Sequence, residues 1–120
     1  MIAAFNAGDL GAVQEIVSAN VVYTVPGKSP LAGRTEGLPS HVEMLKKARQ
    51  MSDGTLELTP EAVAQDGEHV FVWGTIRARR GERQLQAKHC VVFRFDGGKI
   101  VEGWTVPTDL YAFDEFWSGP

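Results

Sequence analysis

The fold is decided by the stretch from residue 93 to residue 104, which reads FRFDGGKIVEGW. Two strand-like runs flank Gly97-Gly98, and a short glycine-bearing connection of this kind is typical of an antiparallel hairpin. Asp66-Gly67 and Gly81-Glu82 separate further strand-like runs upstream. The pattern therefore predicts a meander of antiparallel strands over Thr55–Gln65, Glu68–Arg80, Arg83–Phe95 and Lys99–Val106.

Two features predict the shape of this meander. Several runs are well beyond the ~5–6 residues of a usual strand, so the strands must coil strongly to bury their faces in a small domain. Pro60 has no N–H to donate to a ladder, so the first strand should be broken, bulged or at a sheet edge there.

The residues before the meander indicate helices around one strand. After a break at Gly8, Asp9 is placed to cap a helix. The apolar residues at helical spacing in that helix are Leu10, Val13, Ile16 and Val17. A β-branched run over Val21–Pro26 predicts a strand, and Gly27–Gly37 is expected to be a loop.

Two more helices are expected. Ser40 and Glu43 have the spacing of a capping box, which predicts a helix from there to about Met51. Thr108 or Asp109 is placed to cap a short C-terminal helix. This order of elements predicts an α+β fold, in which helices gather on one side of a curved sheet and leave a cone-shaped cavity for a small molecule.

Length and composition limit the class of protein. A chain of 120 residues predicts a single domain over residues 1–120. Lys and Arg number 12 and Asp and Glu 15, and the net charge of −3 argues against a nucleic-acid or anionic-membrane partner. No apolar run is long enough to span a bilayer. The single Cys and the lack of a recognisable signal peptide predict a cytoplasmic location.

The two faces of the sheet follow from the alternation of side chains along a strand. In the third meander strand one row is apolar apart from a single imidazole, and it consists of His89, Val91, Phe93 and Phe95. We expect this row to face the cavity. The opposite face carries Val92, Trp104 and Val106, which would be a sticky patch if exposed, so a homodimer through the outer sheet face is expected.

Five pieces of the sequence carry a family resemblance. They are AAFNAGDL (3–10), VYTVPG (22–27), GKSPLAG (27–33), FRFDGGKI (93–100) and VEGW (101–104). In this order and spacing, the chain resembles the nuclear-transport-factor-2-like superfamily, and within it the SnoaL-like polyketide cyclases and the ketosteroid isomerases. The resemblance implies a cystatin-like α+β barrel, a cone-shaped and mostly antiparallel sheet wrapped around N-terminal helices, with a deep apolar pocket.

The catalytic groups of the ketosteroid isomerases do not carry over to this sequence. The position of their general-base carboxylate corresponds here to Thr24 or Val25. The phenol and the protonated acid of their oxyanion hole correspond to Met1 and Val91. Apart from the Thr24 hydroxyl, none of these side chains can move a proton or donate a hydrogen bond. The chain is therefore not expected to be a working ketosteroid isomerase.

Two other groups of enzymes in the superfamily place their catalytic residues at different positions. SnoaL-like cyclases tend to use a His or Asp on the last strand, where the inward candidates here are Gly103 and Thr105. The Asp-Arg-Asp arrangement of related epoxide hydrolases is missing, because Arg77 has no evident carboxylate partner on an inward row.

His89 remains the strongest candidate for a catalytic residue, because an imidazole can act as an acid or a base near neutral pH. Its structural alternative is a partly buried imidazole that is hydrogen-bonded for stability. Thr24 and Thr105 are further catalytic candidates. The predicted substrate-binding residues are Tyr23, Val25, Trp73, Arg77, Val91, Phe93 and Gly103.

Two other chemistries are not expected. His89 and Cys90 are adjacent, but neighbours on a strand point to opposite faces, so they cannot form a nucleophile–base pair. The three His lie on different predicted elements without paired ligand spacing, so neither a metal nor a cofactor is expected.

The sequence thus predicts a pocket enzyme of the SnoaL-like kind, an isomerase, cyclase or hydratase that acts on an apolar, ring-containing substrate. The alternative is a non-catalytic ligand-binding or dimerisation module of the same fold, favoured by the lack of an evident inward carboxylate. A weaker third hypothesis is a structural dimer whose cavity is filled by side chains.

Overall fold

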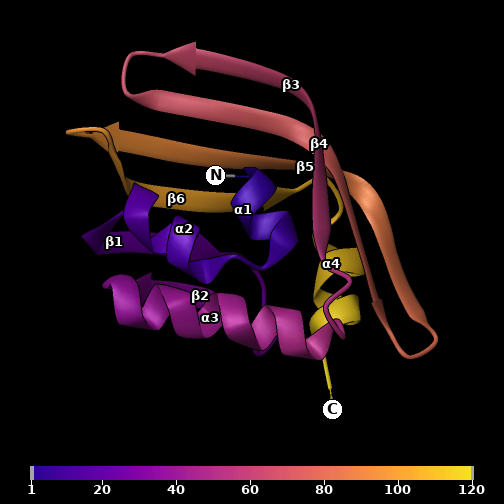
Figure 1. The fold of residues 1–120 in the computed structure, drawn as a ribbon. Coiled ribbons are helices and arrows are strands. Elements are labelled where there is room, and N and C mark those ends of the chain that lie inside the picture. The colour runs from indigo at the N-terminus through magenta and orange to yellow at the C-terminus, as the bar shows by residue number, and fades with distance from the viewer. Residues whose placement is uncertain (1, 120) are drawn as a thin grey trace.

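The computed structural model describes the backbone of residues 2–119 and the side chains of residues 5–119. Along the chain the elements are α1 (Ile2–Ala7), α2 (Leu10–Ile16), β1 (Val17–Val25), β2 (Gly33–Glu36), α3 (Leu38–Met51), β3 (Glu57–Asp66), β4 (His69–Arg80), β5 (Arg83–Asp96), β6 (Lys99–Pro107) and α4 (Leu110–Trp117). The predicted α+β meander is confirmed, with α1, α2 and α3 on one side of a strongly curved sheet (Figure 1).

The sheet has six strands in the order β2-β1-β6-β5-β4-β3. β1 runs parallel to β6, and all other neighbouring strands are antiparallel. Because β2 and β3 end the order without pairing to each other, the sheet stays open. The expected cystatin-like, cone-shaped architecture is therefore confirmed, but the sheet does not close into a barrel.

Several local predictions are confirmed by the hydrogen bonds at the helix ends. The Asp9 carboxylate accepts a bond from the backbone N–H of Ala12 at 3.0 Å, and Asp109 accepts one from the backbone N–H of Ala112 at 3.0 Å. Both aspartates therefore cap their helices as expected. The register between β3 and β4 shifts between Pro60 and Ala62, which is the bulge that the proline predicts.

Three element boundaries differ from the sequence prediction. The expected loop over residues 27–37 contains the short edge strand β2, which pairs with β1. β1 begins directly at Val17, which the periodicity had placed in the preceding helix. The Ser40–Glu43 capping box is wrong, because α3 already begins at Leu38 with a proline in its first turn and no side-chain cap.

Close packing of strands explains one glycine that the sequence leaves unexplained. Gly74 of β4 lies opposite Pro60 at the bulge, and a Cβ at this position would collide with the backbone carbonyl of Thr59. The most deeply buried side chains lie between the helices and the sheet, and they include Val13, Val17, Val21, Ile100 and Trp117. No helix among the described residues is long and apolar enough to cross a membrane.

Candidate functional site

A cavity of about 100 Å³ lies between the concave face of the sheet and the helices. Its walls come from α1, β1, the β1–β2 loop, α3, β3 to β6 and α4, and they are almost entirely apolar. The side chains in the wall that carry a nitrogen or oxygen atom are Tyr23, His41, His89, Thr105 and Trp117. Among the described residues, no Asp, Glu, Lys or Arg lines the cavity.

Three of the polar side chains follow a diagonal across β1, β6 and β5. The strand register places Tyr23 opposite Gly103 and Thr105 opposite Val91, and His89 lies two residues before Val91 on the same face of β5. The hydroxyl groups of Tyr23 and Thr105 are 2.7 Å apart and share a hydrogen bond. Diagonal neighbours on one sheet face are ~7–8 Å apart, so the imidazole lies within reach of a ligand that touches the hydroxyl pair.

Gly103 makes this arrangement possible. A Cβ at this position would lie 2.5 Å from the ring of Tyr23, so only glycine allows the phenol to cross β6 toward Thr105. Burial raises the pKa of Tyr23 to about 12, although the hydrogen bond with Thr105 lowers it in part. The phenol is therefore uncharged at neutral pH and can donate a hydrogen bond.

His89 lies where the strand alternation predicts, with 3% of its surface exposed. Its ring centroid is 5.8 Å from that of Phe113 on α4. Its Nδ1 atom is buried and has no hydrogen-bond partner among the described residues. Burial lowers the pKa of His89 to about 4, so the imidazole is neutral at pH 7.

A second imidazole, which the sequence analysis did not select, lines the same cavity. His41 on α3 is also 3% exposed, and its ring centroid is 5.1 Å from that of Tyr23. Its Nδ1 atom is likewise buried without a partner in the described part of the chain, and burial lowers the pKa of His41 to about 4. The signal that could have identified it is helical spacing, because the lining residues of α3 are His41, Met44, Leu45 and Ala48.

The predicted catalytic and substrate-binding residues divide between the two faces of the sheet. Tyr23, Val25, Val91, Phe93 and Thr105 line the cavity, as the sequence analysis expects. Gly103 supports the ring of Tyr23 instead of facing open space. The position of Met1, aligned with the phenol of the ketosteroid isomerases, lies outside the described residues.

The expected cavity positions of Thr24, Trp73 and Arg77 are wrong. Thr24 lines a shallow groove on the opposite face with Pro26 and Trp104. Trp73 is 42% exposed, and the guanidinium of Arg77 donates to the hydroxyl of Thr59 at 3.3 Å. The cause is strand alternation, because the residues of β4 that enter the core are Val72, Ile76 and Ala78.

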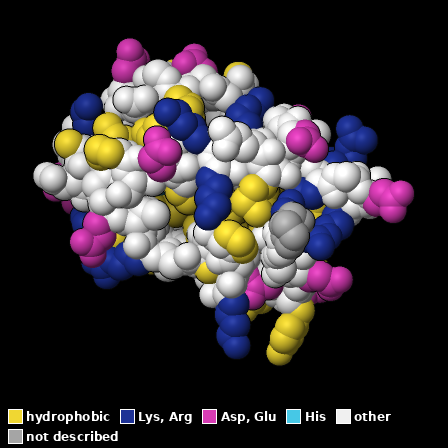
Figure 2. Space-filling view, turned by 90° about the horizontal axis from the view of Figure 1, so that it is seen from below, with side chains coloured by type: hydrophobic (Ala, Val, Ile, Leu, Met, Phe, Trp, Pro, Cys, Tyr) yellow, Lys and Arg dark blue, Asp and Glu magenta, His cyan; other side chains and the backbone are white. Residues whose placement is uncertain are grey.

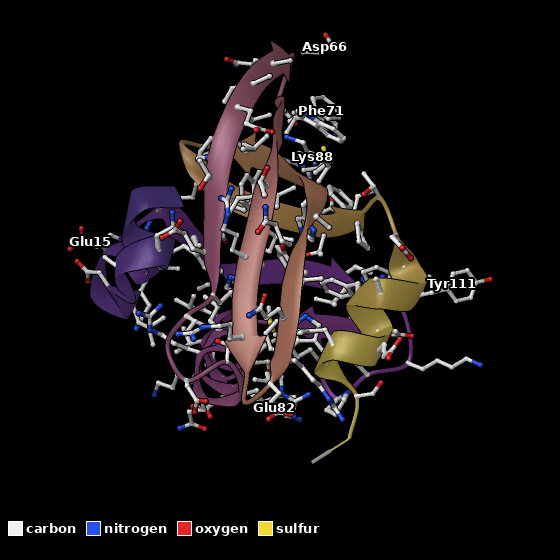
Figure 3. All side chains as sticks on the ribbon, turned by 90° about the vertical axis from the view of Figure 1, so that its right-hand side faces the viewer. Glu15, Asp66, Phe71, Glu82, Lys88 and Tyr111 are labelled. Atoms are coloured by element: carbon white, nitrogen blue, oxygen red, sulfur yellow. The ribbon has the colours of Figure 1, made fainter. Side chains whose placement is uncertain are left out.

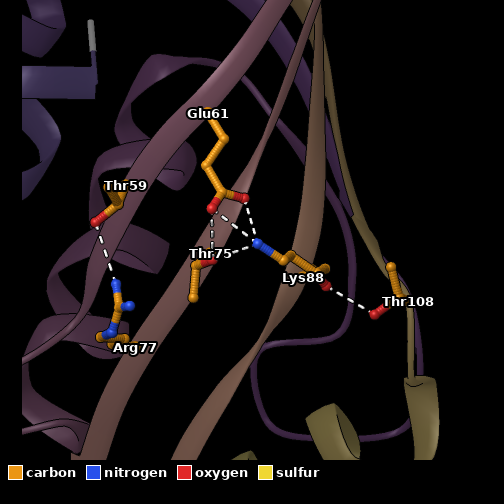
Figure 4. Close-up of polar contacts among 6 residues, drawn as sticks. All are labelled: Thr59, Glu61, Thr75, Arg77, Lys88 and Thr108. Atoms are coloured by element: carbon orange, nitrogen blue, oxygen red, sulfur yellow. Dashed lines mark hydrogen bonds and ion pairs between the residues drawn. The ribbon is translucent and has the colours of Figure 1, made fainter.

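The outer face of the sheet carries charges instead (Figure 4). The ammonium of Lys88 donates to both carboxylate oxygens of Glu61, at 2.5 and 2.8 Å, and to the hydroxyl of Thr75 at 3.2 Å. The hydrogen bond from Lys88 is the main cause that lowers the pKa of Glu61. Figure 3 shows Lys88 and Phe71 on the side of the sheet away from α2, and Tyr111 directed outward from α4.

No group of three or more His, Cys, Asp or Glu side chains that could hold a metal occurs in the described part of the chain. Cys90 has a free thiol whose pKa is raised by burial, and it shares the outer row with Lys88. On the α3 side, charged groups of both signs surround scattered hydrophobic side chains, and no histidine is visible (Figure 2).

Known proteins share this architecture. A family model described as SnoaL-like domain matches residues 1–103. The structure of Bal32a, from a soil-derived mobile gene cassette, is 31% identical with a TM-score of 0.93, and the alignment covers 97% of this chain and 89% of Bal32a. A Xanthomonas campestris protein with a cystatin-like fold is 25% identical with a TM-score of 0.93, over 98% of this chain and 92% of that one.

A more distant structure is that of TerC co-crystallised with polyporic acid, which is 22% identical with a TM-score of 0.84 over 96% of this chain and 90% of TerC. Comparison with curated proteins finds no significant match. The family match, the identity to Bal32a and the open curved sheet agree with one another. The chain therefore belongs to the SnoaL-like domain family.

Proposed function

We propose that the cavity binds an apolar, ring-containing small molecule and that the protein is an isomerase, cyclase or hydratase of the SnoaL-like kind. The observation that carries this proposal is the buried Nδ1 atom of His89, which has no hydrogen-bond partner among the described residues and lies in an almost entirely apolar cavity wall. A buried polar atom without a partner costs free energy, so such an atom is a candidate for contact with a ligand.

In the proposed reaction, His89 and Tyr23 act on one substrate. The neutral imidazole of His89 takes a proton from a carbon next to a carbonyl group, and the Tyr23 hydroxyl donates a hydrogen bond to the carbonyl oxygen, which becomes negative. Thr105 holds the phenol in place through the hydrogen bond of 2.7 Å. The imidazolium then returns the proton to a different carbon, so the product is an isomer and no atom is gained or lost.

The burial of His89 determines how strong a base the imidazole is in the proton abstraction. A pKa of about 4 makes the free imidazole a weak base, so proton transfer depends on the oxyanion contact and on the new charge pair between imidazolium and enolate. Because the imidazole is already neutral, the rate of the proton abstraction should not change with pH between 5 and 8 through this residue.

The alternative function is a non-catalytic module that only holds an apolar ligand. The absence of carboxylates from the described cavity wall favours this alternative. The discriminating substrate is cyclohex-3-en-1-one, whose isomerisation to the conjugated cyclohex-2-en-1-one is followed by ultraviolet absorbance. The enzyme proposal predicts turnover by the wild type and a loss of at least ~100-fold in His89→Gln, with binding retained.

The matched control is Thr24→Val on the opposite face of the sheet, which should retain the wild-type rate. Binding of the ketone without turnover would support the non-catalytic module. A His89→Gln variant with the wild-type rate would remove His89 from the reaction.

We also propose that the protein forms a homodimer through its outer sheet face, defined here by Phe71, Trp73, Val92, Trp104 and Val106. Exposed fractions of 38% for Phe71, 42% for Trp73 and 47% for Val106 support this proposal, since neighbouring exposed apolar residues favour association. Light scattering at several concentrations should give a dimer for the wild type and a monomer for Val106→Asp.

A cytoplasmic location is proposed as well, supported by the single, unpaired cysteine.

A further inference from the structure

We infer that the cavity selects single-ring, uncharged molecules that carry an oxygen substituent, with His41 as a second polar contact and α4 as the wall that limits ligand size. This inference deepens the proposed function and rests on the same cavity. It follows from the charge of the wall, from the positions of its polar atoms, and from the hydrogen bonds that hold α4.

Charge comes first. Among the described residues, the side chains that line the cavity include no carboxylate, ammonium or guanidinium group. Both imidazoles are neutral at pH 7, and the phenol of Tyr23 is neutral too. A charged ligand would lose its hydration without gaining a partner of opposite charge. The wall therefore discriminates against carboxylates and ammonium ions and accepts uncharged molecules.

The polar atoms favour a ligand with at least one oxygen. The Tyr23–Thr105 hydroxyl pair lies on the sheet side, and the ring of His41 faces Tyr23 from α3 at 5.1 Å. Nδ1 of His41 and Nε1 of Trp117 are buried without partners among the described residues. A carbonyl or hydroxyl oxygen beside Tyr23 would accept a hydrogen bond from the phenol, while Thr105 donates to the phenol oxygen, and would also approach the imidazole of His41. A pure hydrocarbon can do neither.

The volume of the cavity limits the ligand to about one ring. The cavity holds about 100 Å³, whereas an apolar cavity of about 150 Å³ is known to accept benzene, and sites for larger ligands enclose about 300–1,000 Å³. A single six-membered ring therefore needs only small adjustments of the wall. A four-ring steroid would require the displacement of a whole element.

α4 carries Phe113 and Trp117 into the cavity wall, and side-chain hydrogen bonds hold it through Asp114 and at its C-terminal end. On one side, the Asp114 carboxylate accepts hydrogen bonds from the backbone N–H groups of Lys28 at 2.8 and 2.9 Å and Ser29 at 3.2 Å. At its C-terminal end, the guanidinium of Arg80 donates to the carbonyl of Phe116 at 2.7 Å. These contacts keep the wall in place and so maintain the size limit.

The Arg80 contact reaches beyond the last turn of α4. The same guanidinium also donates to the carbonyls of Ser118 at 3.1 Å and Gly119 at 3.2 Å. An Arg80→Leu variant removes all three bonds and leaves the bond from Arg83 to the Ser118 carbonyl in place. It changes no lining residue, since Arg80 does not line the cavity. This variant therefore separates the size limit from the chemistry of the wall.

The test is calorimetric titration of the wild-type protein with three probes of matched design. Cyclohex-2-en-1-one is the uncharged single ring, cyclohex-1-ene-1-carboxylate is its charged counterpart, and progesterone is the four-ring ketone. We expect the enone to bind with a Kd on the order of 1 mM or tighter. The carboxylate should bind at least ~30-fold more weakly, and progesterone should not bind detectably. Arg80→Leu should gain progesterone binding and keep its discrimination against the carboxylate.

The contribution of His41 is tested with His41→Phe, which keeps a ring in the same place. The variant should weaken cyclohex-2-en-1-one binding about 5- to 10-fold and leave the binding of toluene unchanged, since toluene has no oxygen. Thr24→Val is the control and should change neither. Equal losses for both probes would mean that His41 acts only by packing and would overturn its assigned role.

The inference is overturned if the enone fails to bind, if the carboxylate binds equally well, or if progesterone binds the wild type more tightly than the enone. These outcomes are separate from the catalytic test. Selective binding of cyclohex-2-en-1-one, with no turnover of cyclohex-3-en-1-one, supports the inference and rejects the enzyme. His89-dependent turnover of a steroid, without enone binding, supports the enzyme and rejects the inference.

Discussion

Lys88 and His89 are neighbours on β5, yet they lie in opposite environments. On the outer face, Lys88 pairs with Glu61, and both side chains remain in contact with water. On the inner face, His89 is buried against Phe113, and its Nδ1 atom has no partner among the residues that the structure describes. One step along a strand therefore separates a hydrated ion pair from a cavity without formal charge. The difference is one of charge, since no charged side chain among the described residues lines the cavity, whereas the outer face keeps its ion pair in contact with water.

The largest expected effect comes from placing a charge on each face in turn. Val91→Asp introduces a carboxyl group into the cavity wall, and Val92→Asp introduces one on the outer face. We expect Val91→Asp to lower the free energy of unfolding by about 3 kcal/mol at pH 7, because the buried carboxylate has no cation to pair with. Val92→Asp should cost about 1 kcal/mol or less when both variants are compared in the monomeric Val106→Asp background, where the proposed dimer interface does not contribute. Urea unfolding of both variants measures the contrast, and equal losses would contradict it.

The pH dependence of stability should reflect the two buried imidazoles. The pKa of His41 and of His89 is about 4 in the folded protein, against 6.5 for an ordinary imidazole, so the unfolded chain binds more protons between these values. The contribution of these imidazoles to the free energy of unfolding is therefore fully present above pH 6.5. It is lost as the pH falls from 6.5 through 4. Each imidazole should contribute a loss of about 2 kcal/mol at pH 5.

Denaturant unfolding at pH 7 and pH 5 checks this dependence. His89→Gln should lose about half of the pH-dependent difference, since glutamine does not titrate. A wild-type stability that is unchanged between pH 7 and pH 5 would show that neither ring is desolvated.

A smaller effect is expected at the hydroxyl pair. Thr105→Val removes the hydrogen-bond partner of Tyr23 while keeping the volume of the side chain. The buried phenol then lacks a partner, which should cost about 1 kcal/mol in the absence of ligand. Cyclohex-2-en-1-one should recover part of this loss by accepting a bond from the phenol. Thermal unfolding with and without the enone measures the loss of stability and its recovery. If the enone raises the melting temperature of the wild type more than that of Thr105→Val, the phenol of the variant does not gain its missing partner from the ligand.

The smallest effect is expected on the outer face. Glu61→Gln removes the ion pair with Lys88, but both side chains are well exposed and water replaces the partner. We expect no measurable change in unfolding free energy and no change in ligand binding. A variant with a large loss of stability would mean that this pair is buried in solution, as it would be inside a dimer interface, and dimer dissociation measured in parallel would locate that loss.

The sequence predicts the inner row of β5 well and the inner row of β4 poorly, for a physical reason. On β5 the rows differ clearly, since one contains Val91 and Phe93 and the other contains Lys88 and Arg94. On β4 both rows begin with large apolar residues, so alternation alone does not determine which row is buried. Only the pairing with β5 settles it, because Val72 lies opposite Val91 and Trp73 lies opposite Cys90.

The other differences arise where tertiary contacts override local pattern. The short strand β2 has no apolar residue in its sequence GRTE, and it forms only because β1 offers a free edge. His41 lies in the first turn of a helix, where an imidazole is easily interpreted as exposed. Its burial depends on α3 packing over the sheet, with Tyr23 on the opposite wall. The candidate site is therefore only half predictable from local pattern, because a cavity between layers is defined by the packing of both layers.

The central claim is that both cavity imidazoles are neutral, buried and in contact with the ligand site. The most direct test is a pH titration of ¹⁵N-labelled histidine side chains by NMR, with and without cyclohex-2-en-1-one. We expect His41 and His89 to titrate near pH 4 and the enone to shift their ring nitrogen resonances. Titration of both rings near pH 6.5, with resonances that do not respond to the enone, would contradict that claim.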